Sequence, residues 1–501
     1  MSLIPRTDAP DAAGDRQAWE FACLGVILLV AGWLRFRHLG LMEFKSDEAL
    51  AVRIGRDILH GDVRTTGLTS SAGAANPPLF VYLTALPLAF WNDPRGATGF
   101  VGLLAVVAVA LTYLVLRPRF GTVAALTAAA LLATAPWAVL YGRKLWAQDL
   151  LPVVTVSLLW SLFVVLERRR TRWVVLVPLL FSLAVELNFS ALALVVPVVL
   201  VVLYRWRRVH WPALVLGVAV SLVPLAPWLA HNARHHFRDV VKLAEEGRGH
   251  GGSSSFGTGF VEAVRQTVHL VSAGGWRFVT GPAHESGAAW TFGRAAGVAA
   301  AIALGLGLVT CIVAAVRGGH LRRGWPPVEL HLDAARRALL VVWLLGMWLS
   351  YVTSAKDRVQ PHYLIASYPV TFALAGIGLA DAVRLARGRG AAAVAAVAVT
   401  AVAAAFVAFS LSFQHFVGRN GGTGGDYGIA YEHSLALART LRARSLHTSD
   451  QTTEFLAHGS LDPPSGTTFL VTTRNRLARG PARACAGTVL DFGPLEACVP
   501  R

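Results

Sequence analysis

The feature that most constrains this chain is a succession of apolar segments, most of them followed by a short polar loop. About 20 consecutive apolar residues form a helix that crosses the hydrocarbon core of a bilayer. The composition agrees, since 54% of the 501 residues are hydrophobic and 15% are charged, against about 25% charged in soluble domains. The sequence therefore predicts an all-α polytopic membrane protein.

The arginines between these segments predict the direction of each crossing. The ambiguous segment is 76–91, which is short for a span and is interrupted by Pro87. If it does not span, every strongly basic short loop lies in the cytoplasm, as the positive-inside rule requires. We therefore expect a cytoplasmic N-terminus and a short helix on the outer surface at 76–91. The eleven predicted spans are 18–37, 97–116, 120–140, 147–166, 173–187, 189–204, 211–230, 290–316, 338–353, 363–383 and 391–413.

The net charge of +17 can indicate nucleic-acid binding. Here, however, the arginines form short clusters between apolar segments and do not line one face. The charge is better explained by loops that anchor the spans against anionic lipid. We expect no nucleic-acid partner, a bacterial plasma-membrane location and the lipid bilayer as surroundings.

Four regions follow from this topology. We expect residues 1–17 to be disordered in the cytoplasm and 18–414 to form the membrane domain, with 38–96 as its first outer loop. Residues 415–501 are expected to form a small extracytoplasmic α/β domain.

The C-terminal domain begins with a glycine-rich run from Gly418 to Tyr427, expected to be a flexible linker or a tight loop. Within the domain, 468–473 is typical of a strand. Cys485 and Cys498 can form a disulfide if the domain faces an oxidising compartment.

The first outer loop opens with the stretch from Glu43 to Arg53. Ser46 is expected to cap a helix, with Asp47 and Glu48 in its first turn, where the helix dipole favours negative charge. Residues 47–59 have the spacing of a short amphipathic helix on a membrane surface.

The outer loops together bring acids and bases to one membrane face. A glycosyl transfer from a lipid phosphate needs a carboxylate to take the acceptor's proton and cations to hold the leaving phosphate. This face offers both kinds of group. The candidates are Asp47, Glu48, Asn76, Arg143, Lys144, Asp149, Lys356, Arg358, His362 and Tyr363.

Several candidates also have a structural interpretation. Arg143 and Lys144 can anchor the chain at the membrane interface, and Asp149 can cap the next span. His362 and Tyr363 can likewise be interfacial side chains. Outside this set, the histidines at 231, 235 and 236 resemble a metal cluster but are more typical of a solvated run. Glu186 marks either a site or the membrane edge.

The motifs Phe44-Lys45-Ser46-Asp47-Glu48-Ala49 and Asn76-Pro77-Pro78-Leu79 resemble those of the membrane-embedded GT-C glycosyltransferases. The resemblance is to glycosyltransferase family 39, which includes protein O-mannosyltransferases and lipid A aminoarabinose transferases. The run from Arg143 to Asp149 and the sequence Pro361-His362-Tyr363-Leu364 fit later loops of the family.

The resemblance implies a transferase that uses a polyprenyl-phosphate sugar and a protein, lipid or envelope-glycan acceptor. It implies Asp47 as the general base and Glu48 as its neighbour and as a ligand of substrate or of a divalent metal. Whether a metal takes part is left open. Asn76 stands where many family members have other residues before the Pro-Pro pair.

Two other functions are considered. A transporter or flippase for polyprenyl-linked sugars usually carries ionisable groups near mid-span and in paired halves. Here the charges gather at loop ends, which favours the enzyme. A structural protein that binds partners through its C-terminal domain is the third alternative.

Overall fold

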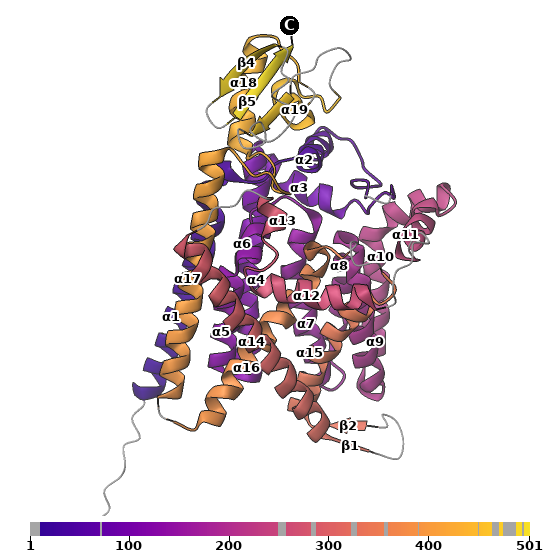
Figure 1. Ribbon diagram of the computed structural model, residues 1–501. Helices are drawn as coiled ribbons and strands as arrows, with labels where there is room; N and C mark the ends of the chain where they lie inside the picture. Colours follow the sequence, from indigo (N-terminus) through magenta and orange to yellow (C-terminus); the bar gives the residue numbers. More distant parts are fainter. Residues whose placement is uncertain are drawn as a thin grey trace, which may run out of the picture.

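The computed structural model describes residues 11–70, 73–248, 257–281, 287–321, 328–354, 359–388, 390–448, 450–462, 470–473, 487–492 and 495–500. They form a bundle of long helices with a small unit of helices and strands at one end (Figure 1). The main helices of the bundle are α1 (Asp11–Phe36), α4 (Pro94–Phe120), α5 (Thr122–Thr134), α6 (Pro136–Tyr141), α7 (Leu151–Glu167), α8 (Leu176–Leu187), α9 (Val195–Tyr204), α10 (Trp211–Arg234), α14 (Ala288–Arg317), α15 (Leu332–Leu349), α16 (Tyr368–Ala386) and α17 (Ala391–Asn420).

The remaining elements are short and lie mostly at the ends of the bundle. The helices are α2 (Ser46–Leu59), α3 (Leu79–Phe90), α11 (Arg238–Arg248), α12 (Thr258–Val271), α13 (Arg277–Thr280), α18 (Tyr431–Ala443) and α19 (Gln451–His458). The 3-10 helices are η1 (Leu39–Leu41), η2 (Ala147–Leu150), η3 (Arg172–Val175), η4 (Phe189–Leu194), η5 (Trp206–Arg208) and η7 (Pro361–Ser367). The strands are β1 (Gly319–Leu321), β2 (Val328–Leu330), β3 (Leu470–Thr473), β4 (Gly487–Phe492) and β5 (Leu495–Pro500).

Each of the eleven predicted spans corresponds to one helix or to two consecutive helices. Within the described residues, seven helices are long and apolar enough to cross a membrane. The chain is therefore a polytopic all-α membrane protein, and the total of eleven crossings stays a prediction. The seven are Gln17–Phe36, Pro94–Phe120, Ala147–Glu167, Trp211–Arg234, Ala288–Arg317, Pro361–Ala386 and Ala391–Asn420.

The segment 76–91 forms α3, a helix of 12 residues that contains Pro87. Twelve residues rise about 18 Å along a helix, well short of the roughly 30 Å hydrocarbon core. α3 packs beside α2, at the same end of the bundle as the C-terminal unit (Figure 1). This agrees with a surface helix rather than a span.

The centre of the bundle is α16, which packs closely against α14 and α5. Small residues allow the backbones to approach, because a Cβ built on Gly307 of α14 would lie 1.8 Å from the carbonyl oxygen of Leu374. A Cβ built on Gly376 of α16 would lie 2.2 Å from the carbonyl oxygen of Ala124 in α5. Such contacts are typical of helix packing in membranes, where dispersion forces replace the hydrophobic effect.

The predicted span 120–140 is broken, because α5 ends at Thr134 and α6 begins at Pro136. Proline has no N–H to continue the helix, so carbonyl groups are left without intrahelical donors. The buried guanidinium of Arg35 in α1 donates to the carbonyl oxygens of Leu132, Ala133 and Ala138 at 2.9–3.2 Å. The carbonyl groups at the break thus receive hydrogen bonds from a side chain of another helix.

Arg143, which follows α6, in turn caps the C-terminal end of α1. Its guanidinium donates to the carbonyl oxygens at the C-terminal end of α1 and just beyond, those of Leu34, Arg35, Arg37 and His38, at 2.7–3.1 Å. Arg143 is 5% exposed. Two buried arginines therefore join α1 to the α5–α6 break in both directions.

Beyond α17 the chain makes a tight loop and not a free linker. The Thr423 N–H donates to the carbonyl oxygen of Gly428, and the Ala430 N–H donates to that of Gly421. The loop is tied to the bundle by the Thr423 hydroxyl, which donates to the carbonyl oxygen of Val279, and by the Tyr427 hydroxyl, which donates to that of Leu41.

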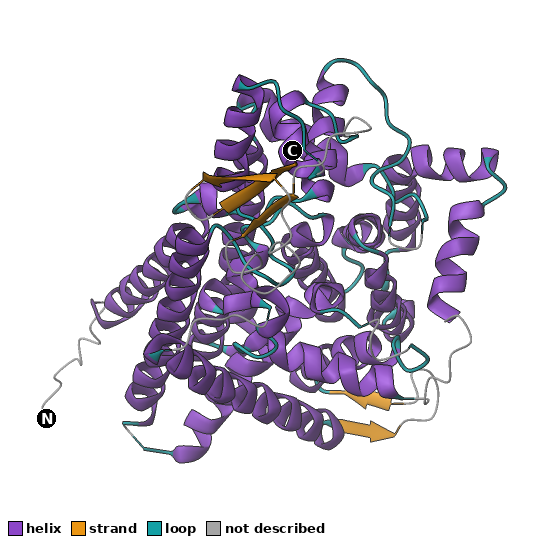
Figure 2. Cartoon of the chain, turned by 45° about the horizontal axis from the view of Figure 1, so that its top comes forward, coloured by secondary structure: helices purple, strands orange, loops and turns teal. Residues whose placement is uncertain are grey.

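The C-terminal unit contains α18, α19 and an antiparallel sheet with the order β3-β5-β4. Figure 2, viewed closer to the end of the bundle, shows this sheet lying over the helices. Strand β3 matches the strand predicted at 468–473, of which 470–473 is described. Cys485 lies outside the described residues, so the Cys485–Cys498 pairing stays a prediction.

Three predicted boundaries shift. α1 already begins at Asp11, so 11–17 is helical and not disordered, and α17 continues to Asn420, beyond the boundary expected at 414. Lys45, not Ser46, is the N-cap of α2, because Ser46 is already helical. The cap is made by the backbone N–H of Lys45, which donates to Glu48 at 2.9 Å.

We expect Arg143→Met to destabilise the protein by about 3 kcal/mol or more, because each buried carbonyl left without a donor costs about 1–3 kcal/mol. Thermal unfolding in detergent measures the effect. Arg294→Met is the control, since Arg294 is an exposed arginine on α14, and we expect a change within about 0.5 kcal/mol. Equal stability of the two variants would contradict the capping role.

Candidate functional site

Four segments far apart in the sequence meet where α1 ends. They are the start of α2, the turn that joins α6 to α7, the 3-10 helix η7 and the loop after α17. The N-cap of α2 and the Arg143 contacts with α1 fix the first two against each other. The candidate site is therefore built where helix ends meet a turn and a tight loop.

Lys144 is the central cation of the site and is almost fully buried. Its ammonium donates to Glu43 at 2.7 Å, where the two side chains are 2% and 3% exposed. Asp426 from the loop after α17 lies 3.8 Å away. Burial of a charge is tolerated only when it is paired, and Lys144 meets this condition.

Lys45 is the second cation and is partly exposed. Its ammonium lies 2.6 Å from Glu43 and 3.3 Å from the Asp426 carboxylate, and it donates to the Asp426 carbonyl at 2.7 Å. Burial opposes its protonated form, but the charges of Glu43 and Asp426 outweigh that effect, so the pKa of Lys45 is raised. Lys45 stays charged throughout the physiological range.

Glu48 and Asp149 occupy equivalent positions in two different helix starts. Each carboxylate accepts a hydrogen bond from the backbone N–H three residues earlier, Lys45 at 2.9 Å and Trp146 at 3.1 Å. In each, the other oxygen is buried and has no hydrogen-bond partner among the described residues. The capping interpretation of Asp149 is thus met by one of its two oxygens.

Burial raises the pKa of Glu48 to about 7, and the neighbouring charge of Glu43 acts in the same direction. Lys144 and Lys45 partly offset the rise. Glu48 therefore titrates near neutral pH and can act there as a proton acceptor or donor.

Aromatic side chains connect this charged group to η7. The ring of Trp146 has the Lys144 ammonium 3.1 Å from its centroid and the His362 ring at 5.1 Å. His362 in turn contacts Tyr363 at 4.2 Å between ring centroids. The Trp146 indole N–H is buried and has no acceptor among the described residues.

The site brings together five of the predicted residues: Glu48, Lys144, Asp149, His362 and Tyr363. Asp47 lies beside Glu48 on the first turn of α2, but its side chain is exposed. Lys356 and Arg358 lie outside the described residues.

Two predicted residues instead hold the backbone. The guanidinium of Arg143 is bonded to the end of α1. The Asn76 amide donates to the carbonyl oxygen of Leu68 at 2.9 Å, within the loop that precedes α3.

Sequence reasoning assigned no role to Glu43, Trp146 or Asp426. Glu43 directly precedes the motif that begins at Phe44, and an acid in that position indicates a candidate site residue. Asp426 lies in a glycine-rich run that resembled a linker, and no local pattern reveals that it meets Lys45, 381 positions away.

Other candidates are accounted for as follows. His231 stacks on His235 and lies 3.6 Å from Asp239, and in the described part of the chain these histidines do not form a group with metal-ligand spacing. Asp47 and Glu48 do not belong to such a group there either. Both carboxylate oxygens of the buried Glu186 have no hydrogen-bond partner among the described residues.

Comparison with known proteins gives a family match and a fold. Residues 75–231 match the family described as dolichyl-phosphate-mannose-protein mannosyltransferase. That match begins beside the Asn76-Pro77-Pro78 motif and includes Lys144 and Asp149, but not Asp47. Among curated protein sequences none matches the chain.

The fold is similar to that of ArnT from Cupriavidus metallidurans in the apo state, with a TM-score of 0.59 and 14% identity over 97% of this chain and 98% of that chain. The structure of the same protein bound to undecaprenyl phosphate matches with a TM-score of 0.58 and 14% identity, over 96% and 98%. The predicted GT-C-like fold is thereby confirmed, and the resemblance to glycosyltransferase family 39 is supported by the family match over residues 75–231.

We expect stability to depend on pH through Glu48. Its folded pKa of about 7 lies above the usual 4.5, so the unfolded chain ionises first and stability is lost as pH rises through 7. The total is up to about 3 kcal/mol. Unfolding of wild type and Glu48→Gln at pH 5 and pH 8 measures it.

The stability of Glu48→Gln relative to wild type should increase from the lower to the higher pH. Asp47→Asn removes an exposed carboxylate from the same helical turn and is the matched control. A difference between Glu48→Gln and wild type that does not change with pH would exclude a raised pKa.

Proposed function

We propose that this protein is an integral-membrane glycosyltransferase of the bacterial plasma membrane. It moves a sugar from a polyprenyl-phosphate donor to a protein, lipid or envelope-glycan acceptor at the outer face. The N-terminus lies in the cytoplasm and the C-terminal unit outside. The observation that carries the proposal is the buried group of Glu43, Glu48, Lys144 and Asp149 at one end of an apolar bundle.

Supporting observations come from the fold and the family match. ArnT has the same fold and has been crystallised with undecaprenyl phosphate, which is a polyprenyl phosphate. The matched family is described as using a dolichyl-phosphate sugar. The arginine distribution supports a position of the charged group on the outer side of the membrane.

Asp47 is our candidate for the general base. It is exposed, whereas Glu48 is buried and bonded to the backbone N–H of Lys45. A base must come within hydrogen-bond reach of the acceptor hydroxyl, and the exposed carboxylate of Asp47 is accessible to an acceptor that arrives from outside. Glu48 supports it by capping the turn that carries Asp47.

The buried polar atoms without partners fit a sugar. Sugar hydroxyl groups can donate to the free oxygens of Glu48 and Asp149, and a hydroxyl oxygen can accept from the Trp146 indole N–H. Lys144 provides positive charge for the leaving phosphate. Lys356 and Arg358, which lie outside the described residues, stay sequence-based candidates for the same role.

The reaction is a single displacement with inversion. Asp47 takes the proton of the acceptor hydroxyl, and the oxygen forms a bond to the anomeric carbon. The bond from that carbon to the phosphate oxygen breaks, and its electron pair leaves with the polyprenyl phosphate. The cations stabilise the charge that develops on this phosphate.

A vesicle assay tests the function. The purified protein is reconstituted with polyprenyl-phosphate hexoses and pentoses and with envelope extract, and mass spectrometry follows the sugar. We expect loss of sugar from one donor and its appearance on an acceptor. A sugar-lipid that crosses the bilayer chemically unchanged would instead indicate a flippase.

We expect Asp47→Asn to lower transfer by about 100-fold or more, since general-base catalysis contributes about 10²- to 10⁴-fold. The variant should fold and insert, because the side chain is exposed. Asp57→Asn on the same helix is the control and should retain near-normal turnover. Normal turnover of Asp47→Asn would refute the assignment of this residue.

A further inference from the structure

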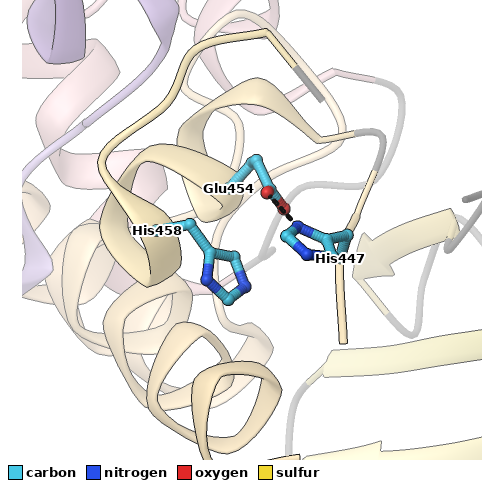
Figure 3. A group of neighbouring side chains, drawn as sticks. All are labelled: His447, Glu454 and His458. Atoms are coloured by element: carbon cyan, nitrogen blue, oxygen red, sulfur yellow. Dashed lines mark hydrogen bonds and ion pairs between the residues drawn. The ribbon is translucent and has the colours of Figure 1, made fainter. Parts of the chain in front are cut away.

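A cluster of two histidines and one glutamate lies in the C-terminal unit. His447 is in the turn between α18 and α19, while Glu454 and His458 lie one helical turn apart on α19. Figure 3 shows the three side chains facing one another. One ligand atom from each lies within 4.8 Å of the other two, and among the described residues no other group has this spacing.

The contacts of the cluster hold its donors in place. Glu454 is 1% exposed and accepts from the Thr448 N–H at 2.8 Å. Its other oxygen lies 2.6 Å from Nδ1 of His447, and Nε2 of His458 lies 2.9 Å from the carbonyl oxygen of Leu446. The two imidazole rings lie 4.3 Å apart between centroids.

We propose that His447, Glu454 and His458 bind one divalent transition-metal ion, best fitted by Zn²⁺. Zinc sites take imidazole nitrogen and carboxylate oxygen at about 2.0–2.2 Å. Two imidazoles among three donors favour zinc over magnesium or calcium, which prefer oxygen. The donor atoms lie within 4.8 Å of one another, and in the proposed site water supplies a fourth ligand.

The alternative is a histidine–glutamate hydrogen bond that merely closes the turn before α19. The size of the unit favours the metal. Among the described residues of the unit, its own cluster of buried apolar side chains has five members. Units of fewer than about 80 residues often need a metal or a disulfide for stability. The buried apolar members are Leu437, Ala438, Leu441, Ala457 and Leu495.

The position of the site gives the metal a mechanical role. Phe455, next to Glu454, is buried, and the Arg56 guanidinium of α2 lies 5.9 Å from the centroid of its ring. A metal that ties α19 to the preceding turn fixes the surface that contacts α2. The site is independent of the proposed transfer reaction, and its test requires no substrate.

The full chain in detergent is stripped with chelator, loaded with Zn²⁺ and freed of excess metal, and zinc is counted by mass spectrometry. We expect about one zinc per chain. The double variant His447→Ala, His458→Ala should lose it, and Glu454→Gln should bind roughly 10- to 100-fold more weakly. His415→Ala, which removes an exposed histidine of α17, should retain it.

A second measurement uses the unmodified chain and does not depend on whether the variants fold. Zn²⁺ should raise its thermal midpoint, because a ligand that binds only the folded state stabilises it, whereas Mg²⁺ should not. The proposal fails if the wild type retains no zinc. It also fails if the double variant retains as much, which would place the metal elsewhere, for example at the histidines near 235.

Discussion

The structure depends on the rule that a backbone carbonyl buried away from water must receive a hydrogen bond. The break between α5 and α6 and the end of α1 both leave such carbonyls. Arg35 and Arg143 satisfy them in a reciprocal arrangement. This arrangement holds the turn that begins at Gly142 against the end of α1, and so places Lys144 within 2.7 Å of Glu43.

The charged group follows from that fixed turn. Lys144 and Lys45 share Glu43, and Asp426 returns from the far end of α17 to pair with Lys45. Glu48 and Asp149 each use one oxygen for a helix cap, and the other has no hydrogen-bond partner in the described part of the chain. In the proposed function these two carboxylates serve both structure and sugar recognition, and the exposed Asp47 is the proposed general base.

The C-terminal unit extends this arrangement to the last part of the chain. The tight loop after α17 joins it to the bundle through Thr423 and Tyr427, while α19 faces α2 through Phe455. The helix that carries Asp47 therefore contacts the bundle on one side and the C-terminal unit on the other.

The sequence by itself determined the membrane class, the positions of the apolar helices and the short helix within 76–91, and it showed two motifs that resemble those of GT-C glycosyltransferases. These depend on hydropathy, segment length and the positions of prolines, which can be read from each segment alone. Only the tertiary structure showed that Arg143 caps α1 and that the Asn76 amide hydrogen-bonds within the loop before α3. It also showed that Glu43 and Asp426 form ion pairs with Lys45. Buried ion pairs and caps depend on which helix ends come together in space. The hydrophobic periodicity of a sequence does not indicate these long-range contacts.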